Sequence, residues 1–525
     1  MAALAAAVVA ACALAAPAAA VTYAPNWTSL DSRPNPDWYD DAKVGIFIVG
    51  GVFSVPSWGD PKANGGASGE WFQSEWEIQK RPSYVEFMQQ NYPPGFTYAD
   101  FAAQLSYELF NASAWAELFV AAGAKYTAFL TKHHDGFTMW PSDTSFNWNS
   151  VDVGPRRDVT GDVSAAVKAA GMHLGLYHSM FEWLNPAFLA DQAANFTTRA
   201  FPPKTLGELR DLVTRYQPDL LWSDGDWSAG DDYWQAPEFL AWLVNDSPVK
   251  DSVVFNDRWG KGNTCHHGSF YTCQDRYNPG TLQQHKWENA MTLDVHSWGY
   301  RRNAPASDYL SLAALLQQLV STIAFGGNLL VNVGPAADGT IPVVMEERLR
   351  GMGAWLGVNG EGVYATAPWR AQNESAAAAY YTAAKAGGAV YVHLLAWPRG
   401  GALSLALPVP GPAASAALLA AGGALPVQVV QGAPGAPGLR LQLCVLGGAC
   451  AGGGAARRAT VRRPSRLYFL THNTHTQTLP PPRPPGPRTS PTCAARAVTL
   501  LGWCACRGWS DGGEWAVLER AMQTN

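Results

Sequence analysis

Two acidic side chains stand where an apolar run of the sequence ends. In PDLLWSDGDW, residues 218–227, Asp224 and Asp226 follow the run DLLW and lie between two tryptophans. A further acid, Glu288, lies later in the chain in QHKWENA. Two carboxyl groups held roughly 5–5.5 Å apart can hydrolyse a glycosidic bond with retained configuration, one as nucleophile and one as acid and base. A helix cap or a turn salt bridge is the structural alternative for either acid.

Other side chains with chemical capability also follow apolar runs. His133 and His134 come directly after YTAFLT, and Arg258 follows VVFND. A neutral imidazole can hydrogen-bond a sugar hydroxyl, and the planar guanidinium of Arg258 can orient a carboxylate. Glu70 and Trp71 follow the glycine-rich ANGGASG, which indicates part of a loop that serves a site. Ordinary packing and surface salt bridges are the structural alternatives.

The same polar residues allow a metal-binding interpretation. His133, His134, His178 and Asp224 all lie at the ends of apolar runs, and imidazole and carboxylate are metal-ligand types. A metal-dependent hydrolase is therefore an alternative, and it predicts loss of activity on chelation.

The elements that must position these residues follow from hydrophobicity. Short apolar runs alternate with helix-like stretches, which is typical of a parallel sheet covered by helices. Continuous hydrophobicity within each run fits strands buried on both faces, and polar residues after the runs predict a site at the carboxyl ends of the strands. No GxGxxG or P-loop follows the first run, which disfavours a nucleotide-binding fold. The sequence predicts an α/β fold, a (β/α)8-type (TIM-like) barrel over 21–367, with strands at 44–49, 126–131, 174–177, 219–224, 253–257 and 329–334.

The character of the sequence changes after the barrel. Residues 368–470 contain short strand-like runs such as GALSLALPV and GLRLQLCVL between Gly/Pro turns, which predicts a C-terminal antiparallel β-sandwich. Residues 471–525 hold the Pro-rich linker LPPPRPPGPRTSP and a tail that fits neither domain. We expect this tail to be disordered; the alternative is that it is not part of the natural mature protein. Residues 1–20 are apolar and end in small residues, which is typical of a secretory signal peptide cleaved near Ala20.

Composition excludes some partners and favours others. A net charge of −5 leaves no basic footprint for nucleic acid, and no later run is long enough to span a bilayer. The 22 tryptophans favour carbohydrate, because aromatic faces stack on the C–H faces of sugars. Together with the leader, N-x-S/T sequons favour a secreted or lysosomal-type glycoprotein. The sequons begin at Asn26, Asn111, Asn195 and Asn373, and a fifth, at Asn245, is followed by Pro248.

The cysteines favour disulfides over metal ligands. Cys265 and Cys273 lie close together in a polar loop, so we predict a bond between them. Cys444 and Cys450 are a second candidate pair. No CxxC pair occurs, so a structural zinc site is not expected.

At these residues the chain resembles the α-L-fucosidases of glycoside hydrolase family 29, in particular the animal lysosomal type. The matching stretches run in order from about residue 36 to about 370, and the similarity is weaker through the predicted β-domain. They include NYPPGFTYADF, TKHHDGFTMWPS, NWNSVDVGPRRD, GLYHS, PDLLWSDGDW, NDRWG, HKWE, SWGYRR and GGNLLVNVGP. A match of this extent is more specific than any single motif.

The resemblance implies roles for individual residues. Asp224 corresponds to the family's nucleophile, and Glu288 matches the acid/base of the animal-type members. The positions that match the lining of the family's fucose pocket are His133, His134, Tyr177, Arg258, Glu70, Trp71 and Trp298. The resemblance also implies retaining hydrolysis of terminal α-L-fucosides of glycans or glycoproteins, without a metal or other cofactor, and it hints at a homo-oligomer.

One departure from the family pattern concerns the predicted pocket. The family reads IHWG after the first strand, whereas this chain reads IVGG, so Val49 replaces a pocket histidine and Gly50 replaces a tryptophan. Losing a hydrogen bond to a buried hydroxyl costs about 1–3 kcal/mol, roughly ten- to a hundredfold in affinity. A fucose-binding protein with weak or lost turnover is therefore the alternative, and an aryl fucoside assay separates the two.

Overall fold

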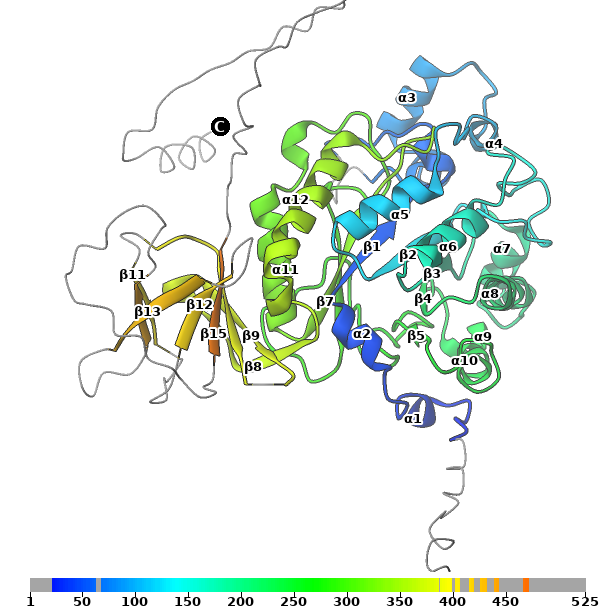
Figure 1. Cartoon of the computed structure of the whole chain (residues 1–525). Coiled ribbons are helices and arrows are strands. Elements are labelled where there is room, and N and C mark those ends of the chain that lie inside the picture. The colour runs from blue at the N-terminus through cyan, green and yellow to red at the C-terminus, as the bar shows by residue number, and fades with distance from the viewer. Residues whose placement is uncertain are drawn as a thin grey trace, which may run out of the picture. The chain divides into compact units, whose positions relative to one another are not determined.

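The computed structural model describes residues 21–62, 68–386, 388–398, 402–406, 415–419, 425–431, 439–442 and 466–471. The predicted signal peptide at 1–20, the candidate Cys444–Cys450 bond and the predicted tail beyond residue 471 lie outside these ranges. The described parts contain a parallel sheet surrounded by helices and a second, mainly antiparallel sheet (Figure 1).

A parallel sheet in the order β5-β4-β3-β2-β1-β7-β6 forms the centre of the first domain. Every residue of its strands is buried, as expected for strands covered on both faces. The six predicted strands are confirmed, whereas β6 was missed because Glu288, Asn289 and Thr292 interrupt its apolar pattern. The strands are β1 (Val44–Ile48), β2 (Tyr126–Lys132), β3 (Gly175–Ser179), β4 (Leu220–Asp224), β5 (Val254–Phe255), β6 (Trp287–Thr292) and β7 (Gly327–Val333).

Residues 269–271 lie between the two edge strands, β5 and β6. The backbone N–H of Ser269 donates to the Phe255 carbonyl at 2.9 Å. On the other side, Tyr271 donates to the Lys286 carbonyl and accepts from the Glu288 N–H, both at 2.9 Å. This short extended segment takes the place of an eighth strand and closes the sheet, which confirms the TIM-like class. It differs from a regular (β/α)8 unit because residues 256–286 contain no helix.

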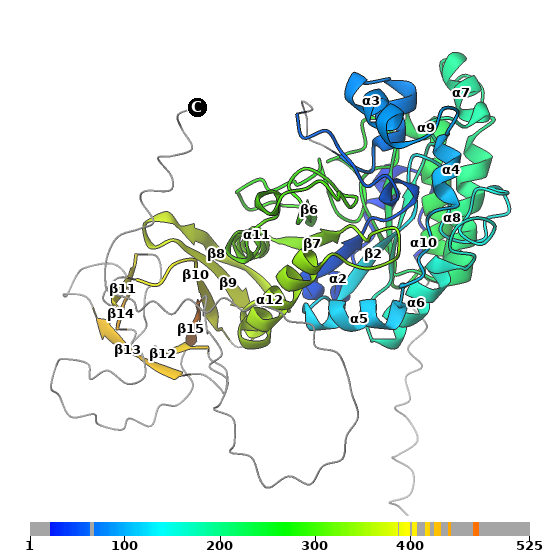
Figure 2. The same ribbon diagram turned by 90° about the horizontal axis from the view of Figure 1, so that it is seen from above.

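Helices surround the parallel sheet, and Figure 2 shows α5, α6, α8, α10, α11 and α12 around its outside. Local sequence explains where several begin. Side chains of Asn111, Asp158 and Ser311 accept hydrogen bonds from the first-turn N–H groups of α5, α6 and α11. The described α-helices are α1 (Trp27–Leu30), α2 (Asp37–Ala42), α3 (Pro82–Asn91), α4 (Tyr98–Ala102), α5 (Ala112–Ala121), α6 (Val159–Ala169), α7 (Pro186–Ala193), α8 (Pro202–Tyr216), α9 (Asp231–Trp234), α10 (Ala236–Asn245), α11 (Leu312–Ala324) and α12 (Val343–Asn359).

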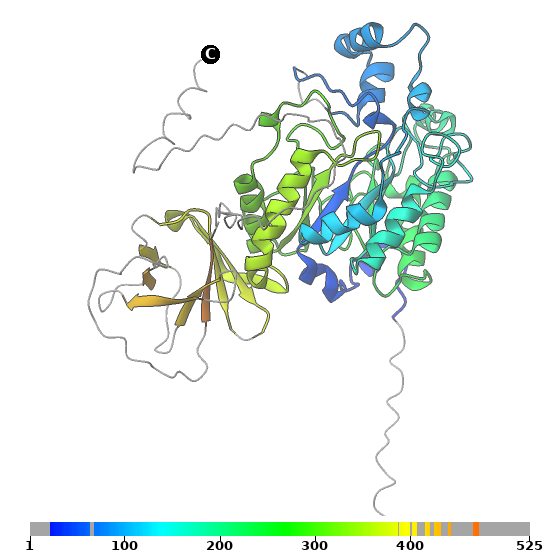
Figure 3. The same cartoon turned by 45° about the horizontal axis from the view of Figure 1, so that its top comes forward.

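The second sheet, yellow to orange in Figure 3, has the order β11-β14-β13-β12-β15-β10-β9-β8. Its pairs are antiparallel except that β15 runs parallel to both β10 and β12 and joins the two antiparallel halves. Buried apolar residues of β9, β10, β11, β12 and β14 share one core, as in a folded-over sheet. The strands are β8 (Thr366–Glu374), β9 (Ala379–Ala384), β10 (Val390–Leu394), β11 (Ala402–Leu405), β12 (Ser415–Leu418), β13 (Leu425–Gln431), β14 (Leu439–Gln442) and β15 (Arg466–Thr471).

The structure separates the sequons into two kinds. Four of the asparagines are exposed, and these are Asn26, Asn111, Asn195 and Asn373. The fifth, Asn245, is bonded through both side-chain atoms to the backbone of Tyr23. In the part of the chain that the structure describes, no helix has the length and apolar character needed to cross a membrane.

A buried charge cluster lies behind the carboxyl end of β2. The Lys132 ammonium, fully buried, lies 3.0 Å from Glu182 Oε1 and 2.7 Å from Glu208 Oε2. Lys204 contacts the same two carboxylates, and His178 Nε2 lies 3.5 Å from Glu208. Burial by itself would raise the pKa of Glu208, but Lys132 outweighs it and holds that pKa well below its ordinary value. The cluster anchors the strand end from which His133 and His134 continue.

We expect Lys132→Met to lower the free energy of unfolding by about 3–5 kcal/mol, because it leaves two buried carboxylates with one cation. Chemical denaturation of the variant measures this loss. The exposed Lys62 provides the control, since Lys62→Met should change stability by no more than about 0.5 kcal/mol. Equal stability of Lys132→Met and the unaltered protein would contradict the role given to the cluster.

Candidate active site

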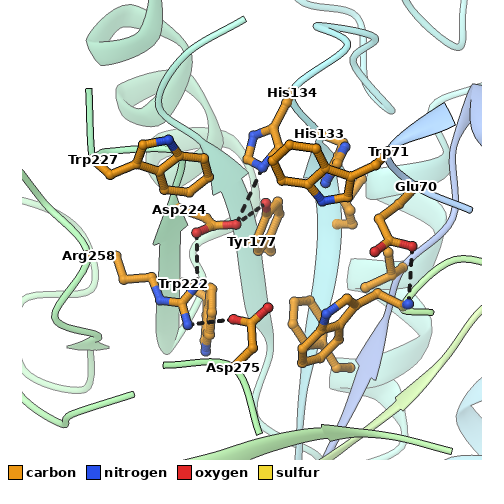
Figure 4. A pocket seen from close by; sticks show the side chains of 14 residues that line it. Glu70, Trp71, His133, His134, Tyr177, Trp222, Asp224, Trp227, Arg258 and Asp275 are labelled. Carbon is orange, nitrogen blue, oxygen red and sulfur yellow. Dashed lines mark hydrogen bonds and ion pairs between the residues drawn. The ribbon is translucent and has the colours of Figure 1, made fainter. Parts of the chain in front are cut away.

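A pocket opens at the carboxyl ends of the barrel strands (Figure 4). It contains about 490 Å³ of empty space, part of which is open to solvent. Its lining residues come from strand ends and from the loops that follow them, as the sequence pattern predicted. They are Phe47, Val49, Glu70, Trp71, Leu130, His133, His134, Tyr177, Trp222, Asp224, Trp227, Arg258, Asp275 and Trp298.

Asp224, the last residue of β4, is held from three sides. The Tyr177 hydroxyl donates to Oδ2 at 2.7 Å, and Arg258 Nη1 donates to Oδ1 at 2.9 Å. His134 Nε2 lies 3.7 Å from Oδ2. The Asp224 side chain is 13% exposed, so it faces the pocket with its charge matched by a cation. A carboxylate fixed in this way is oriented for attack on a bound ligand.

Arg258 contacts a second carboxyl in the same pocket. Its Nη2 donates to Asp275 Oδ1 at 2.7 Å, and the Asp275 side chain is 47% exposed at the mouth. Burial by itself would lower the pKa of Arg258, but Asp275 and Asp224 raise it above the ordinary value, so the guanidinium stays cationic. Two acids therefore lie on one guanidinium (Figure 4).

Asp275 was missed by the sequence analysis. It lies in the helix-free loop between β5 and β6, two positions after Cys273, and no apolar run precedes it. The rule that polar residues gather after strands therefore could not find it. The one local signal was its closeness to the predicted disulfide, which the structure confirms between Cys265 and Cys273. Trp222 and Trp227 were also passed over, although they flank Asp224 in PDLLWSDGDW.

Glu288 does not line the pocket. It is the second residue of β6 and pairs in register with Asn328, beside the beginning of β1, whereas the pocket lies at the other ends of these strands. Its side chain is fully buried, and its oxygens accept hydrogen bonds from two tyrosines and Trp222. Burial raises its pKa to about 7. The sequence analysis expected Asp224 and Glu288 to face one another across a ligand. The structure does not bring them together in this way.

Asp226, the other acid of the opening stretch, also stays out of the pocket lining. Its Oδ2 accepts from the Gly260 N–H at 2.7 Å, which ties the loop after β4 to the loop that carries Arg258. Burial raises the pKa of Asp226 to about 6. Asp226 therefore joins two loops, whereas its neighbour Asp224 faces the pocket.

The two pocket histidines are neutral hydrogen-bonding groups. Burial, and then the neighbouring His134, lower the pKa of His133 well below its ordinary value. Burial, with Lys132 and Arg258, lowers the pKa of His134 to about 3. His134 Nδ1 lies 2.6 Å from Ser179 Oγ, whereas His133 Nδ1 is buried with no partner among the described residues. His133 thus lines the pocket with one ring nitrogen that has no partner in the described chain.

Glu70 links two loops and leaves one oxygen available. Its Oε2 accepts from Ser297 Oγ at 3.0 Å and from the N–H groups of Trp298 and Gly299 at 3.1 and 3.0 Å. Its Oε1 is buried and has no partner within the described ranges. Burial raises the pKa of Glu70 above its ordinary value. Glu70 thus holds the backbone at Trp298 in place and keeps one carboxyl oxygen without a partner in the described chain.

Aromatic rings supply the apolar walls. Trp71, Trp222 and Trp298 line the pocket, and Trp227 stands at its mouth with 45% of its surface exposed. Val49 is buried at 2% exposure and forms an apolar part of the wall. Hydroxyl-binding groups and ring faces together suit a monosaccharide, which has both polar edges and C–H faces.

The metal interpretation does not match the arrangement. His178 belongs to the Lys132 cluster and lies between Thr131 and Thr205, not with His133, His134 and Asp224 in the pocket. Within the described part of the chain, no group of three or more His, Cys, Asp or Glu side chains could hold a metal ion.

A pocket with carboxyl groups, neutral histidines and aromatic ring faces at the strand ends of a TIM-like barrel fits the class of glycoside hydrolases. The family model described as Alpha-L-fucosidase matches residues 10–361. The chain therefore belongs to the α-L-fucosidase family, glycoside hydrolase family 29, and the prediction of an enzyme of this family is confirmed.

Individual relatives agree with this assignment. The plasma alpha-L-fucosidase of Rattus norvegicus is 53% identical over 393 residues, which are 74% of this chain and 84% of that protein. The tissue alpha-L-fucosidase of Homo sapiens is 50% identical over 388 residues, 74% and 81% of the two chains. The crystal structure of Thermotoga maritima alpha-fucosidase in complex with fucose superposes with a TM-score of 0.68 at 32% identity, covering 80% of this chain and 96% of that one.

The loop that carries Asp275 is anchored by Asp257. Asp257 Oδ1 accepts from Thr272 Oγ1 at 2.6 Å, and Oδ2 accepts from the N–H groups of Cys265 and Cys273 at 2.8 and 3.1 Å. Thr272 Oγ1 in turn accepts from Arg258 Nε at 3.1 Å. The buried Asp257 therefore connects the disulfide loop to the guanidinium.

We expect Asp257→Ala to lower kcat/KM for an aryl α-L-fucoside about tenfold or more, because it removes three hydrogen bonds that hold the Asp275 loop, and a displacement of about 1 Å at a site can cost about a hundredfold in rate. Steady-state kinetics measure the loss. The exposed Asp251 gives the control, and Asp251→Ala should retain its kinetics. A variant at Asp257 with unaltered kcat/KM would show that the anchor does not position the site.

Proposed function

We propose that this chain is a retaining exo-α-L-fucosidase with Asp224 as the nucleophile and Asp275 as the acid and base. The observation that carries the proposal is the pair of carboxyls on one guanidinium, at 2.9 and 2.7 Å from its two terminal nitrogens. One guanidinium therefore keeps both carboxyls in the same pocket, as the two-carboxyl mechanism requires, and the retaining outcome is taken from the family resemblance. The loop acid at the pocket mouth replaces Glu288 in this role.

Hydrolysis then proceeds by double displacement. A carboxylate oxygen of Asp224 attacks the anomeric carbon of the terminal fucose, while protonated Asp275 gives its proton to the glycosidic oxygen and the aglycone leaves as an alcohol. An ester joins fucose to Asp224. Asp275, now a carboxylate, takes a proton from a water molecule that attacks the anomeric carbon, which releases fucose and frees Asp224. Two inversions retain the configuration.

Other groups of the pocket lining hold the sugar. Glu70 Oε1 accepts a hydrogen bond from a fucose hydroxyl, and neutral His133 contributes its unpartnered Nδ1. Ring faces of Trp71 and Trp298 pack against the apolar methyl and C–H side of the sugar. Because these contacts surround a single sugar unit, the substrate is the terminal fucose of a glycan or glycoprotein.

The same proposal extends to location and assembly. Relatives that are 50–53% identical are named plasma and tissue fucosidases, and four sequon asparagines are exposed. Both observations support a glycoprotein of the secretory route that is secreted or sent to a lysosome-like compartment. A homo-oligomer stays a prediction from the resemblance.

The alternative of a fucose-binding protein without turnover has no support from the comparisons. The relatives are named as fucosidases, and the pocket retains two carboxyls on a cation where a binding site needs none. Val49 is consistent with weaker sugar binding rather than with a lost reaction.

We expect Asp224→Gly to abolish turnover of aryl α-L-fucosides, and Asp275→Gly to lower kcat/KM by about 10²–10⁴-fold for poor leaving groups and far less for a dinitrophenyl fucoside. Azide rescue separates the roles. Azide replaces the nucleophile in Asp224→Gly and yields the β-fucosyl azide, whereas it captures the covalent intermediate in Asp275→Gly and yields the α-fucosyl azide.

The exposed Asp232 supplies the control for this series, and Asp232→Gly should keep normal turnover. An α-fucosyl azide from a Glu288→Gly variant, together with none from Asp275→Gly, would return the acid/base role to Glu288. Normal turnover by Asp224→Gly would overturn the nucleophile assignment.

We expect Val49→His to lower KM for an aryl fucoside by up to about ten- to a hundredfold, because an imidazole adds a hydrogen bond to a buried sugar hydroxyl. Steady-state kinetics of the two forms measure the change. Val49→Leu is the matched control, since it enlarges the side chain without adding a polar atom. Equal kinetics of the histidine and leucine variants would show that no hydrogen bond is gained.

A further inference from the structure

Glu288 lies beneath the pocket with all its hydrogen-bond partners supplied by the barrel interior. Tyr126 Oη donates to Oε2 at 2.5 Å, and Tyr39 Oη donates to the same oxygen at 3.0 Å. Trp222 Nε1 donates to Oε1 at 3.0 Å. These donors come from β2, α2 and β4, and the carboxyl has no exposed surface.

A buried carboxyl lowers the stability of the fold unless its interactions offset the loss of hydration. Taking an ionisable group out of water costs several kcal/mol, and well-packed apolar residues fill barrel interiors at no such cost. Lys286 lies near enough to contribute an attractive charge, but its ammonium is bonded to Asp40 at 2.7 Å and not to Glu288. The side chains that Glu288 holds in place are therefore its three hydrogen-bond donors. Of these three, Trp222 is the one that lines the pocket.

Trp222 supports both groups that orient the nucleophile. The guanidinium carbon of Arg258 lies 4.6 Å from the centroid of the Trp222 ring, a cation–π contact. The Tyr177 ring is stacked on Trp222 with centroids 5.6 Å apart and an interplanar angle of 27°. Arg258 and Tyr177 are also the donors to Oδ1 and Oδ2 of Asp224. A rotation of the indole would displace both.

We propose that Glu288 is a positioning residue: by accepting the Trp222 N–H, it fixes the indole that carries Tyr177 and Arg258, and so orients Asp224 from one layer below. The inference rests on the proposed function, because it concerns the same nucleophile. It gives the buried glutamate a role in the reaction that involves no proton transfer to substrate.

Glu288→Leu and Glu288→Gln test this role. Leucine leaves the Trp222 N–H buried without an acceptor, so we expect kcat/KM for aryl fucosides to fall about ten- to a hundredfold, whereas glutamine keeps an acceptor oxygen and should restore most of the activity. The loss should be equal for good and poor leaving groups, because a positioning residue does not protonate the aglycone. Azide should yield no α-fucosyl azide from either variant.

Trp222→Phe completes a double-mutant cycle with Glu288→Leu. It removes the donor, so adding Glu288→Leu to it should lower kcat/KM much less than Glu288→Leu does alone. Asn289, the next residue of β6, is the matched control: it is buried and bonded to Gln318 and Thr322 on α11, away from the pocket. Asn289→Leu should lower the melting temperature and keep kcat/KM.

Several results would overturn the inference. Normal kinetics for Glu288→Leu would remove the positioning role, and so would additive losses in the double variant. A loss confined to poor leaving groups, with azide rescue, would make Glu288 the acid/base. If the unaltered protein hydrolyses no α-L-fucoside, the proposed function fails by itself. Binding of fucose, measured by calorimetry, then still decides the inference, because Glu288→Leu should weaken it and Glu288→Gln should not.

Discussion

The pocket depends on the guanidinium of Arg258, which lets two acids share a small, partly buried space. Arg258 contacts Asp224 with one terminal nitrogen and Asp275 with the other, so one planar guanidinium holds both acids in the pocket. A lysine presents a single point charge and lacks the two separate nitrogens that make these contacts.

The long loop between β5 and β6 joins the closure of the barrel to the assembly of this site. Residues 269–271 fill the gap between the edge strands, and Asp275 follows within a few residues. Asp257 and the Cys265–Cys273 bond hold the same loop against Arg258. Because one segment both completes the sheet and carries a pocket acid, the position of that acid is tied to the geometry of the barrel itself.

The buried acids around the pocket differ in the groups that they contact. Asp226 accepts a backbone N–H, Glu70 ties two loops together with one oxygen and offers the other, and Glu288 supports an indole. Burial raises the pKa of each. A perturbed pKa therefore does not by itself mark the reacting groups here, and contact with the pocket and with Arg258 is the more informative property.

The sequence by itself determined the barrel class, six of its strands, the disulfide at Cys265 and the placement of Asp224 and the two histidines at strand ends. Hydrophobic runs report burial, and side chains that directly follow a buried strand reach the same rim in any such barrel. Only the tertiary structure placed Asp275 in the pocket and Glu288 outside its lining. Polar residues interrupt the apolar pattern of β6, so this pattern did not predict the strand or its direction. The distance of Glu288 from the pocket end of the barrel could therefore not be predicted either. Asp275 lies in a loop without periodicity, and its place depends on contacts with distant strands that no local pattern records.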